Sequence, residues 1–470
     1  MFGSFEHLYF RFFSDCDIRI SNFISVMEDD EEMDGNTYTV KFIRNLKLEK
    51  LPAPVLKQAK ICLLDLVGAS LAGARVKGAK ILIDFSDQQM GGVKEATVIR
   101  AKKKLPCVAA SLINGFITNA LDIDDGYRKI KGHPGAAVFP TILAVSEKVG
   151  ATGKQLLEAL VVGYEVAIRA GEILHSHYGF YHGSGSWGAI ASAAAAAKLL
   201  RLPESETKHA LGIGEAFAPL VPEIRAVEFP SMAPKDGIPW GALVGTSAAL
   251  LAQKRFTGIP SLLGDSKRNR DVFTLGKDFK IMKLYFKPYP CCRWAHPALD
   301  GLLRIMGKEK ITYKDISRVT LRSFSEAVSL CQTPPATVEE AEYHVLFPVA
   351  VAAVYGEFTP KYLEEKYFRD QRILQFMKKV LIIKDPKIQQ RFPEKCLSEI
   401  EIVTNQDKTF RSGLIAARGD YDLPLSEKEL EDKFIQMTKD VLTGKQIDSI
   451  IEMVKHFEHF HTKDLIKFLK

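Results

Sequence analysis

A segment rich in ionisable side chains, residues 119–140, holds the residue types that acid–base chemistry needs. It reads NALDIDDGYRKIKGHPGAAVFP, so the carboxylates Asp122, Asp124 and Asp125 are followed by several basic side chains and then by His133. Because burying an unpaired charge is costly, this composition indicates either a solvated loop or the lining of a polar pocket. An acid, a base and cations in so short a segment suit proton transfer next to a carboxylate.

His133 is the candidate acid–base residue of this segment. It lies in a Gly-His-Pro-Gly turn, which predicts a helix starting near residue 136 directly after it. A helix N-terminus carries partial positive charge, so it attracts anions and favours the neutral imidazole. A loop histidine with a purely structural role is the alternative.

The same acidic cluster could instead hold a hard cation. An EF-hand loop needs acidic ligands at its first, third and fifth positions and a glutamate at its twelfth. Counting from Asp122, Gly126 occupies the fifth position and His133 the twelfth. The sequence therefore excludes an EF-hand and leaves a looser magnesium site as the alternative to an acid–base site.

Further candidates lie in segments rich in glycine or proline. His182 follows Tyr181 in a glycine- and serine-rich stretch, where small neighbours leave its ring access to a cleft. Lys235 lies in APKDG and Lys287 in KPYP, and rigid turns that fix a lysine suit the binding of a polycarboxylate. The motif RWAHP adds a candidate carboxylate clamp and a further histidine, Arg293 and His296.

The segments that must position these side chains are helical up to about residue 280. Apolar residues recur at helical spacing or small residues predominate in the segments 39–46, 54–73, 107–121, 138–149, 152–168, 189–200, 203–218 and 240–253. Thr152 and Gln155 predict a capping box, and Pro54 suits a first helical turn. Asp65 lies in an apolar pattern, so we expect a paired structural carboxylate there.

The pattern changes beyond residue 280. Residues 316–324 alternate as a strand does, residues 379–383 are rich in β-branched side chains, and an Asn-Gln-Asp turn follows a further apolar run, which indicates a hairpin. Helices are expected between these strands. A second capping box, Ser426 with Glu429, then restarts purely helical sequence.

These patterns predict a mainly α protein. A large all-helical domain is expected from residues 36–280 and 425–470, with a smaller α+β domain, residues 281–424, inserted between its two parts. Residues 1–35 lack the basic start and apolar core of a signal peptide, so we expect a poorly ordered extension, with a short surface helix as the alternative. A small polar substrate is expected in the cleft between the domains.

Composition excludes several classes of protein. The chain has 470 residues, 46% of them hydrophobic and 26% charged, which is typical of globular proteins rather than disordered or fibrous ones. Its net charge of +7 comes without clustered basic and aromatic residues, so we expect no nucleic-acid partner. No apolar run is long enough to span a membrane. Seven cysteines without metal-type spacing favour a reducing, cytoplasmic compartment.

The motifs together resemble those of the MmgE/PrpD family, which includes 2-methylcitrate dehydratase, cis-aconitate decarboxylase and iminodisuccinate epimerase. After DIDDGYR and GHPGA, the sequence continues in the family's order with YHGSGSWGAIASAAAAAKLL from Tyr181, APKDGIPWGALVGTSAALLAQKRFTG from Ala233 and FKPYPCCRWAHPALDG from Phe286. The resemblance covers roughly residue 40 to the C-terminus. It implies a helical domain built from both chain ends, an inserted lid domain and a homodimer formed through the helical domain.

The resemblance also implies roles for individual residues. Asp122, His133 and His182 would be catalytic, whereas lysines at positions 235 and 287 would bind substrate, and no metal or other cofactor would be needed. Gly126 departs from the family, because many of its decarboxylases and dehydratases carry threonine or another side chain there. A hydroxyl that could position substrate is therefore missing, which argues against cis-aconitate decarboxylation.

We therefore expect a cofactor-free lyase that dehydrates a small di- or tricarboxylate such as 2-methylcitrate. Lys235, Lys287, Arg293 and His296 would bind its carboxylates and stabilise the enediolate formed by proton abstraction. An epimerase or isomerase and a cis-aconitate-type decarboxylase are the alternative enzymes. A protein that binds a polycarboxylate without turnover is the alternative from another class.

Overall fold

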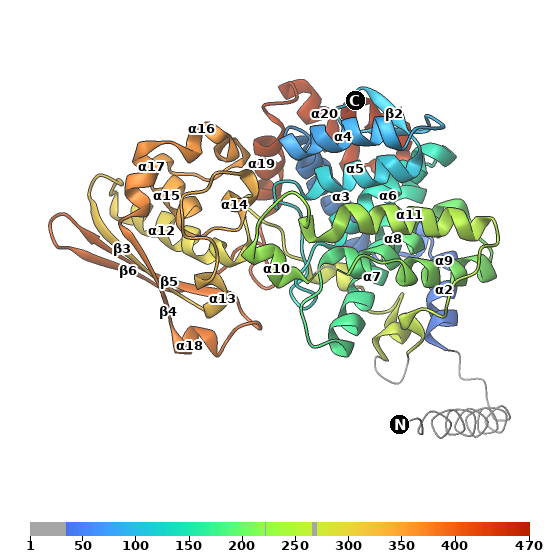
Figure 1. Ribbon diagram of the computed structural model, residues 1–470, viewed down its shortest axis with the longest axis horizontal. Helices are drawn as coiled ribbons and strands as arrows, with labels where there is room; N and C mark the ends of the chain where they lie inside the picture. The colour runs from blue at the N-terminus through green and yellow to red at the C-terminus, as the bar shows by residue number, and fades with distance from the viewer. Residues whose placement is uncertain (1–33, 221, 266–269) are drawn as a thin grey trace, which may run out of the picture.

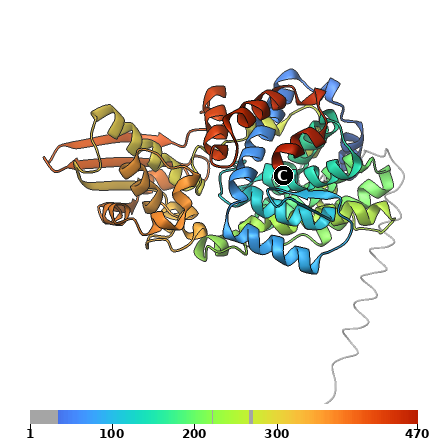
Figure 2. The same ribbon diagram turned by 90° about the horizontal axis from the view of Figure 1, so that it is seen from above.

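A helical body and a smaller lobe with a β-sheet lie side by side in the computed structural model, which describes residues 34–220, 222–265 and 270–470 (Figure 1). Seen from above, the C-terminal helices lie on the body beside N-terminal ones, and the lobe projects to one side (Figure 2). The prediction for residues 1–35 falls, apart from the last two, outside the described residues. None of the described helices combines the length and the apolarity needed to cross a membrane.

The helices of the body come from both parts of the chain. The N-terminal part supplies α2 (Gly35–Asn45), α3 (Ala53–Gly73), α4 (Lys77–Gln89), α5 (Cys107–Asn119), α6 (Pro134–Val149), α7 (Gly153–His177), α8 (Ser184–Leu200), α9 (Glu204–Ala216), α10 (Glu223–Glu228) and α11 (Ile238–Gln253). The C-terminal part adds α19 (Glu427–Thr438), α20 (Gly444–Lys455) and α21 (Thr462–Leu469). A short antiparallel pair, β1 (Ala96–Val98) and β2 (Lys103–Leu105), completes the body.

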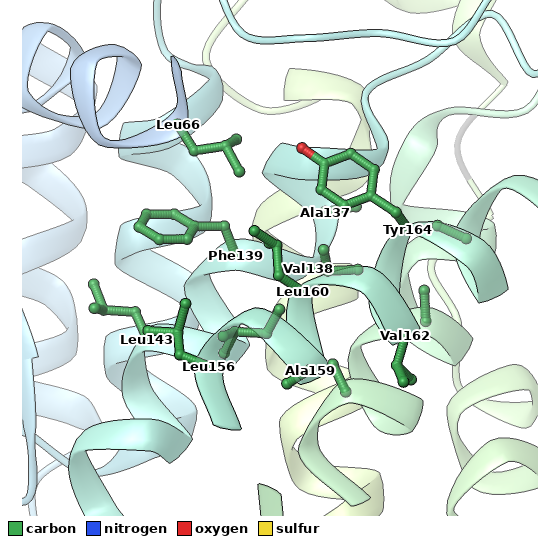
Figure 3. Packing of buried hydrophobic residues seen from close by; sticks show 14 of the residues in the cluster. Leu66, Ala137, Val138, Phe139, Leu143, Leu156, Ala159, Leu160, Val162 and Tyr164 are labelled. Carbon is green, nitrogen blue, oxygen red and sulfur yellow. The ribbon is translucent and has the colours of Figure 1, made fainter. Parts of the chain in front are cut away.

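The core of the body lies where α6 and α7 pack against each other and against α3 and α8 (Figure 3). Phe139 and Leu160 are fully buried there, and burial of such a side chain contributes about 1.5–3 kcal/mol. The α6–α7 contact depends on Gly163, since a Cβ at this position would lie 3.0 Å from the Cβ of Val138. Helix α8 is alanine-rich and buried over nearly its whole length, so small side chains let its neighbours approach closely.

Local signals for helix ends are confirmed at several positions. The Thr152–Gln155 capping box begins α7, the Ser426–Glu429 box begins α19, and Pro54 lies in the first turn of α3. Helix α8 begins at Ser184, five residues before the predicted start at 189. The reason is packing: a Cβ on Gly185 would lie 2.0 Å from the Gly237 carbonyl oxygen, so this glycine allows close contact within a helix rather than forming a loop.

The lobe contains a four-stranded sheet in the order β4-β3-β5-β6. Strands β3 (Ile316–Ser323) and β4 (Val380–Lys384) are parallel, whereas β5 (Leu397–Thr404) pairs antiparallel with β3 and with β6 (Thr409–Ala416), which confirms the predicted hairpin. Helix α12 (His296–Glu309) packs on β5 and β6. The remaining lobe helices are α13 (Ser325–Val328), α14 (Val338–Glu342), α15 (Leu346–Tyr355), α16 (Glu365–Phe368), α17 (Gln371–Met377) and α18 (Pro386–Gln389).

A buried lysine joins the two parts of the body. Lys433, on α19, donates a hydrogen bond to the carboxylate of Asp65 on α3 and another, of 2.7 Å, to the carbonyl oxygen of Ile123. Asp65 is therefore the paired structural carboxylate that the sequence predicts. The mainly α fold class is also confirmed, while movement of the lobe as a lid stays a prediction.

Candidate active site

A cavity lies between the helical body and the lobe, and four of the seven predicted site residues line it. Asp122 and His133 come from the loop between α5 and α6, whereas Lys287 and Arg293 come from the segment that leads into the lobe. Further ionisable lining residues, which the sequence analysis did not single out, are Glu223, Asp236, Tyr285 and Tyr343. The cavity therefore brings together groups from distant parts of the chain.

Asp122 is held by Lys287 in a backbone conformation that is unusual for aspartate. Its φ of 47° lies in the left-handed region, and such conformations concentrate at functional sites. The Lys287 Nζ donates to the Asp122 carbonyl oxygen at 2.9 Å and to its carboxylate Oδ1 at 2.5 Å. Burial alone would raise the pKa of Asp122, but Lys287 and His133 together hold it well below its usual range. The carboxylate is therefore charged at neutral pH.

His133 lies between carboxylates at the N-terminus of α6. Its Nε2 is 3.1 Å from Oδ1 of Asp122, and its Nδ1 is 2.9 Å from Oδ2 of Asp124 and 3.0 Å from the carbonyl oxygen of Asp125. Burial would lower the pKa of His133, but Asp124 and the hydrogen bonds to Asp122 and Asp124 raise it well above its ordinary value. The expectation of a neutral imidazole is therefore wrong, because nearby carboxylates outweigh the helix N-terminus.

Asp125 stabilises the loop between α5 and α6 through hydrogen bonds in the interior of the body. Its carboxyl group accepts hydrogen bonds from the Tyr164 hydroxyl and, at 3.2 Å, from the Gly135 backbone N–H. A Cβ on Gly135 would lie 2.3 Å from both the Asp125 carboxyl and the Tyr164 hydroxyl, so only glycine fits there. Burial and the nearby Asp65 raise the pKa of Asp125 to about 8, which leaves it largely protonated at neutral pH.

Arg293 faces the cavity while the lobe holds its guanidinium. Its two terminal nitrogens donate to the carbonyl oxygens of Arg418 at 2.6 Å and Ala417 at 3.0 Å, and one lies 3.5 Å from the Asp420 carboxylate. His296 lies behind it, outside the cavity lining, with Nε2 3.1 Å from the carbonyl oxygen of Cys291. The geometry therefore supports a carboxylate contact for Arg293 and a structural role for His296.

Lys235 and His182 also lie outside the cavity lining. The Lys235 Nζ is buried and donates to Glu342 of α14 at 2.5 Å and to the carbonyl oxygen of Ala120 at 2.9 Å, so it ties the lobe to the body. His182 is fully buried, with its ring 4.0 Å from that of Phe180, and burial lowers its pKa. Neither of its ring nitrogens has a hydrogen-bond partner among the described residues.

Asp236 and Glu223 form an acidic wall that sequence reasoning missed. Asp236 has a φ of 53°, accepts a 2.9 Å hydrogen bond from the Ser184 hydroxyl and lies 3.7 Å from Nε2 of His133. Burial and the neighbouring Asp236 raise the pKa of Glu223 well above its usual range. Asp236 lies in the motif APKDG, from which the sequence analysis selected Lys235 and not the aspartate.

Gly126 makes room for the ring of Tyr285. The two residues form an antiparallel bridge, with backbone N–O distances of 3.0 and 2.8 Å, and a Cβ on Gly126 would lie 2.3 Å from the Tyr285 hydroxyl. Tyr285 lines the cavity, and the Arg293 guanidinium lies 4.8 Å from its ring centroid. A phenolic hydroxyl thus stands where the sequence analysis found a hydroxyl to be missing.

The cavity combines a histidine whose neighbouring carboxylates favour its protonated form, four cations (Arg128, Lys131, Lys287 and Arg293) and a wall of carboxyl groups. Within the described parts of the chain, no group of three or more His, Cys, Asp or Glu side chains is arranged to hold a metal ion. Lys287 and Arg293 can bind carboxylates, and His133 can donate a proton to a bound molecule. This arrangement can protonate a polycarboxylate and stabilise the negative charge that develops on it.

Comparison with known proteins identifies relatives of both parts of the chain. Residues 38–282 match the MmgE/PrpD N-terminal domain, and residues 289–459 match the MmgE/PrpD C-terminal domain. The chain is 23% identical to cis-aconitate decarboxylase-like protein oryM of Aspergillus oryzae, over 89% of this chain and 93% of that protein. It is 24% identical to cis-aconitate decarboxylase of Homo sapiens (88% and 90%) and 25% identical to that of Aspergillus terreus (56% and 58%).

Proposed function

The chain belongs to the MmgE/PrpD family, and from this premise we propose that it is a lyase that decarboxylates a small unsaturated tricarboxylate of the cis-aconitate type. The observation that carries this proposal is the position of His133 in the cavity lining, with its Nε2 3.1 Å from the Asp122 carboxylate and its Nδ1 2.9 Å from that of Asp124. Carboxylates on both sides of the ring raise the pKa of His133 and favour the form that can donate a proton. The curated relatives that match over most of the chain support the same reaction class. Decarboxylation thus takes precedence over the dehydration expected from the sequence.

Decarboxylation of such a substrate consumes one proton. The bond to the departing carboxylate breaks, its electron pair forms a new carbon–carbon double bond, and CO2 leaves. The electron pair of the original double bond then takes up a proton at its far carbon. His133 supplies this proton from Nε2, the nitrogen that faces Asp122, and becomes neutral until it is protonated again from solvent. Lys287 and Arg293 bind the carboxylates that stay on the product.

Dehydration and epimerisation fit the same residues less well. Both begin with removal of a proton from carbon, which requires a base. Asp122 is a weak base because Lys287 and His133 hold its pKa low, and His133 already carries the proton that a base would have to accept. Dehydration of a hydroxy acid such as 2-methylcitrate is therefore the second candidate. A homodimer remains an expectation from the family resemblance, and a cytoplasmic location remains one from the cysteine pattern.

The test is incubation of the purified protein in heavy water with cis-aconitate, 2-methylcitrate, citrate and iminosuccinate-type diacids, followed by proton NMR. Decarboxylation of cis-aconitate with one deuterium in the product supports the proposal. If a hydroxy acid loses water and no substrate loses CO2, the protein is a dehydratase instead. If a substrate takes up deuterium without any net change, the protein is an epimerase. Line broadening without any reaction identifies a binding protein.

A pair of histidine variants tests the assignment of the proton donor. His133→Gln should lower kcat by about 10²–10⁴-fold, because a general acid contributes an effect of that size. His182→Gln should lower it far less, since His182 lies outside the cavity lining. Melting temperatures measured on both variants control for folding. If His182→Gln loses as much activity as His133→Gln and both remain folded, His182 belongs to the catalytic site.

A further inference from the structure

A second recess, of about 380 Å³, lies beside the cavity and is lined by five cations. Arg128, Lys131 and Pro393 line both spaces, so the two are contiguous. The body contributes the cations and the lobe contributes Pro393, Glu394 and Tyr421. The remaining cations of the recess are Lys129, Lys280 and Lys283. Glu394 is the single acidic residue among the described lining residues, so cationic side chains predominate in the lining.

Three of these cations are presented by a short hairpin that leads directly to His133. The Tyr127 N–H donates to the carbonyl oxygen of Gly132 at 3.0 Å, and the Lys131 N–H donates to that of Arg128 at 3.2 Å. Between the cations, Ile130 is fully buried against α7, where a Cβ on Gly171 would lie 2.8 Å from its side chain. Ile130 and the buried Tyr127 therefore anchor the hairpin, while Lys129 and Lys131 remain outside the core.

The cations of the recess differ in how far acidic groups neutralise them. Arg128 pairs with Asp420 and Asp422 of the lobe, and Lys280 pairs with Glu172 and Asp271. The exposed Lys283 lies 3.6 Å from the Asp278 carboxylate. Lys129 and Lys131 are exposed, and no ion pair involves either of them among the described residues. Lys131 instead lies 5.2 Å from the ring centroid of Tyr181, a residue of the cavity lining. The two recess cations without an ion pair therefore lie on the hairpin, Lys131 at the rim shared with the cavity and Lys129 in the recess alone.

We propose that this recess is a binding site for polycarboxylate anions at the entrance of the cavity, which captures the substrate before it passes between Arg128 and Lys131. The proposal rests on the proposed function only for the identity of the anion. A recess lined by one sign of charge focuses the electric field and raises the local concentration of the opposite ion. This attraction is screened by salt, because the Debye length falls to roughly 10 Å at 0.1 M ionic strength.

The test uses tricarballylate, a saturated tricarboxylate that can undergo neither the decarboxylation nor the dehydration. Its dissociation constant is measured by calorimetry for the wild type, for Lys129→Gln/Lys283→Gln and for the control Lys94→Gln/Lys445→Gln. The control removes the same charge from exposed lysines that line neither space. We expect the recess variant to bind roughly tenfold more weakly than the control at low salt, and the difference to vanish at high salt.

Two further readouts locate the effect. In protein with ¹³C-methylated lysines, the signals of Lys129 and Lys283, assigned from the single variants, should shift on addition of tricarballylate and shift less with inorganic phosphate. With cis-aconitate as substrate, kcat/KM should fall at low salt in the recess variant alone. Equal tricarballylate affinity in both double variants overturns the proposal. If cis-aconitate does not react but the recess variant still loses affinity, the proposed function fails and the anion site stands.

Discussion

Two buried lysine–aspartate pairs, Lys287–Asp122 and Lys433–Asp65, share one design but differ in their surroundings. In each pair the lysine donates to a carboxylate and to a backbone carbonyl oxygen, and the two carbonyls belong to consecutive residues, Asp122 and Ile123. Lys287 approaches this loop from the segment leading into the lobe, and Lys433 approaches it from α19. Segments from the C-terminal half of the chain thus hold the loop on two sides.

The neighbours of each pair decide what its carboxylate can do. Burial tends to raise the pKa of both aspartates, and the lysine of each pair opposes it. Asp122 also lies beside His133, so its pKa ends well below the usual range, whereas Asp65 lies beside Asp124, so its pKa ends above it. Only the Lys287–Asp122 pair lines the cavity. The same kind of ion pair is therefore accessible to a bound molecule at one place and enclosed within the body at the other.

Of the two lysine variants, Lys287→Met should produce the larger effect on catalysis. We expect kcat to fall by roughly 10²–10³-fold, because a cation that stabilises developing charge is lost. The melting temperature should fall less than in Lys433→Met, since Asp122 keeps His133 as a partner. Steady-state kinetics with cis-aconitate and thermal unfolding measure the two quantities. Full activity in Lys287→Met would show that this lysine has no role in catalysis.

Lys433→Met should show the opposite pattern. We expect the free energy of unfolding to fall by about 3 kcal/mol, the lower end of the range for removing one partner of a buried ion pair, because Asp65 can take up a proton. The double variant Lys433→Met/Asp65→Leu should recover most of the lost unfolding free energy, since no buried charge is left. Urea unfolding measures both variants. A larger loss in kcat than in stability would mean that Lys433 acts on the active site through Ile123.

The fold was largely predictable because its signals are local. Helical spacing, the capping boxes and the Asn-Gln-Asp turn each depend on neighbouring residues, and the pairing of Asp65 follows from an acid in an apolar helix face. Position 126 was harder to interpret, because the partner of Gly126 is Tyr285, more than 150 residues later in the chain. A glycine that accommodates a distant ring looks, in the sequence, like an absent functional group.

The candidate site was also predictable only where its residues are close together in the sequence. Asp122 and His133 lie in one segment, so their types and spacing indicated chemistry directly. The charge of His133 was predicted incorrectly, because it depends on where the Asp122 and Asp124 carboxylates lie around the ring rather than on the helix start. Lys235 looked like a ligand because its turn is rigid. Its partner, Glu342, comes from the lobe and could not be inferred from sequence.

Asp125→Asn should produce the smallest effect and separates support of the loop from its chemistry. The folded-state pKa of Asp125, about 8, exceeds the ordinary value of 3.8, so the protonated carboxyl stabilises the fold at low pH and this contribution is lost as pH rises between those values. Asparagine is a neutral mimic whose carbonyl can still accept from Gly135. We therefore expect near-normal kcat and a shallower decline in unfolding free energy from pH 5 to pH 8.

Urea unfolding at several pH values measures this slope, with Asp122→Asn as the contrasting variant. The folded-state pKa of Asp122 is lowered, so its charged form stabilises the fold above the unfolded value, and that contribution is lost only as pH falls through the folded-state pKa. Asp122 itself titrates below this range, so Asp122→Asn should alter the slope between pH 5 and pH 8 only through a lower pKa of His133, while it abolishes most of the activity. An unchanged slope in Asp125→Asn would show that Asp125 is ionised in the folded protein. The hydrogen bonds from Tyr164 and Gly135 would then outweigh burial and the neighbouring Asp65, and the loop would carry one more negative charge near His133.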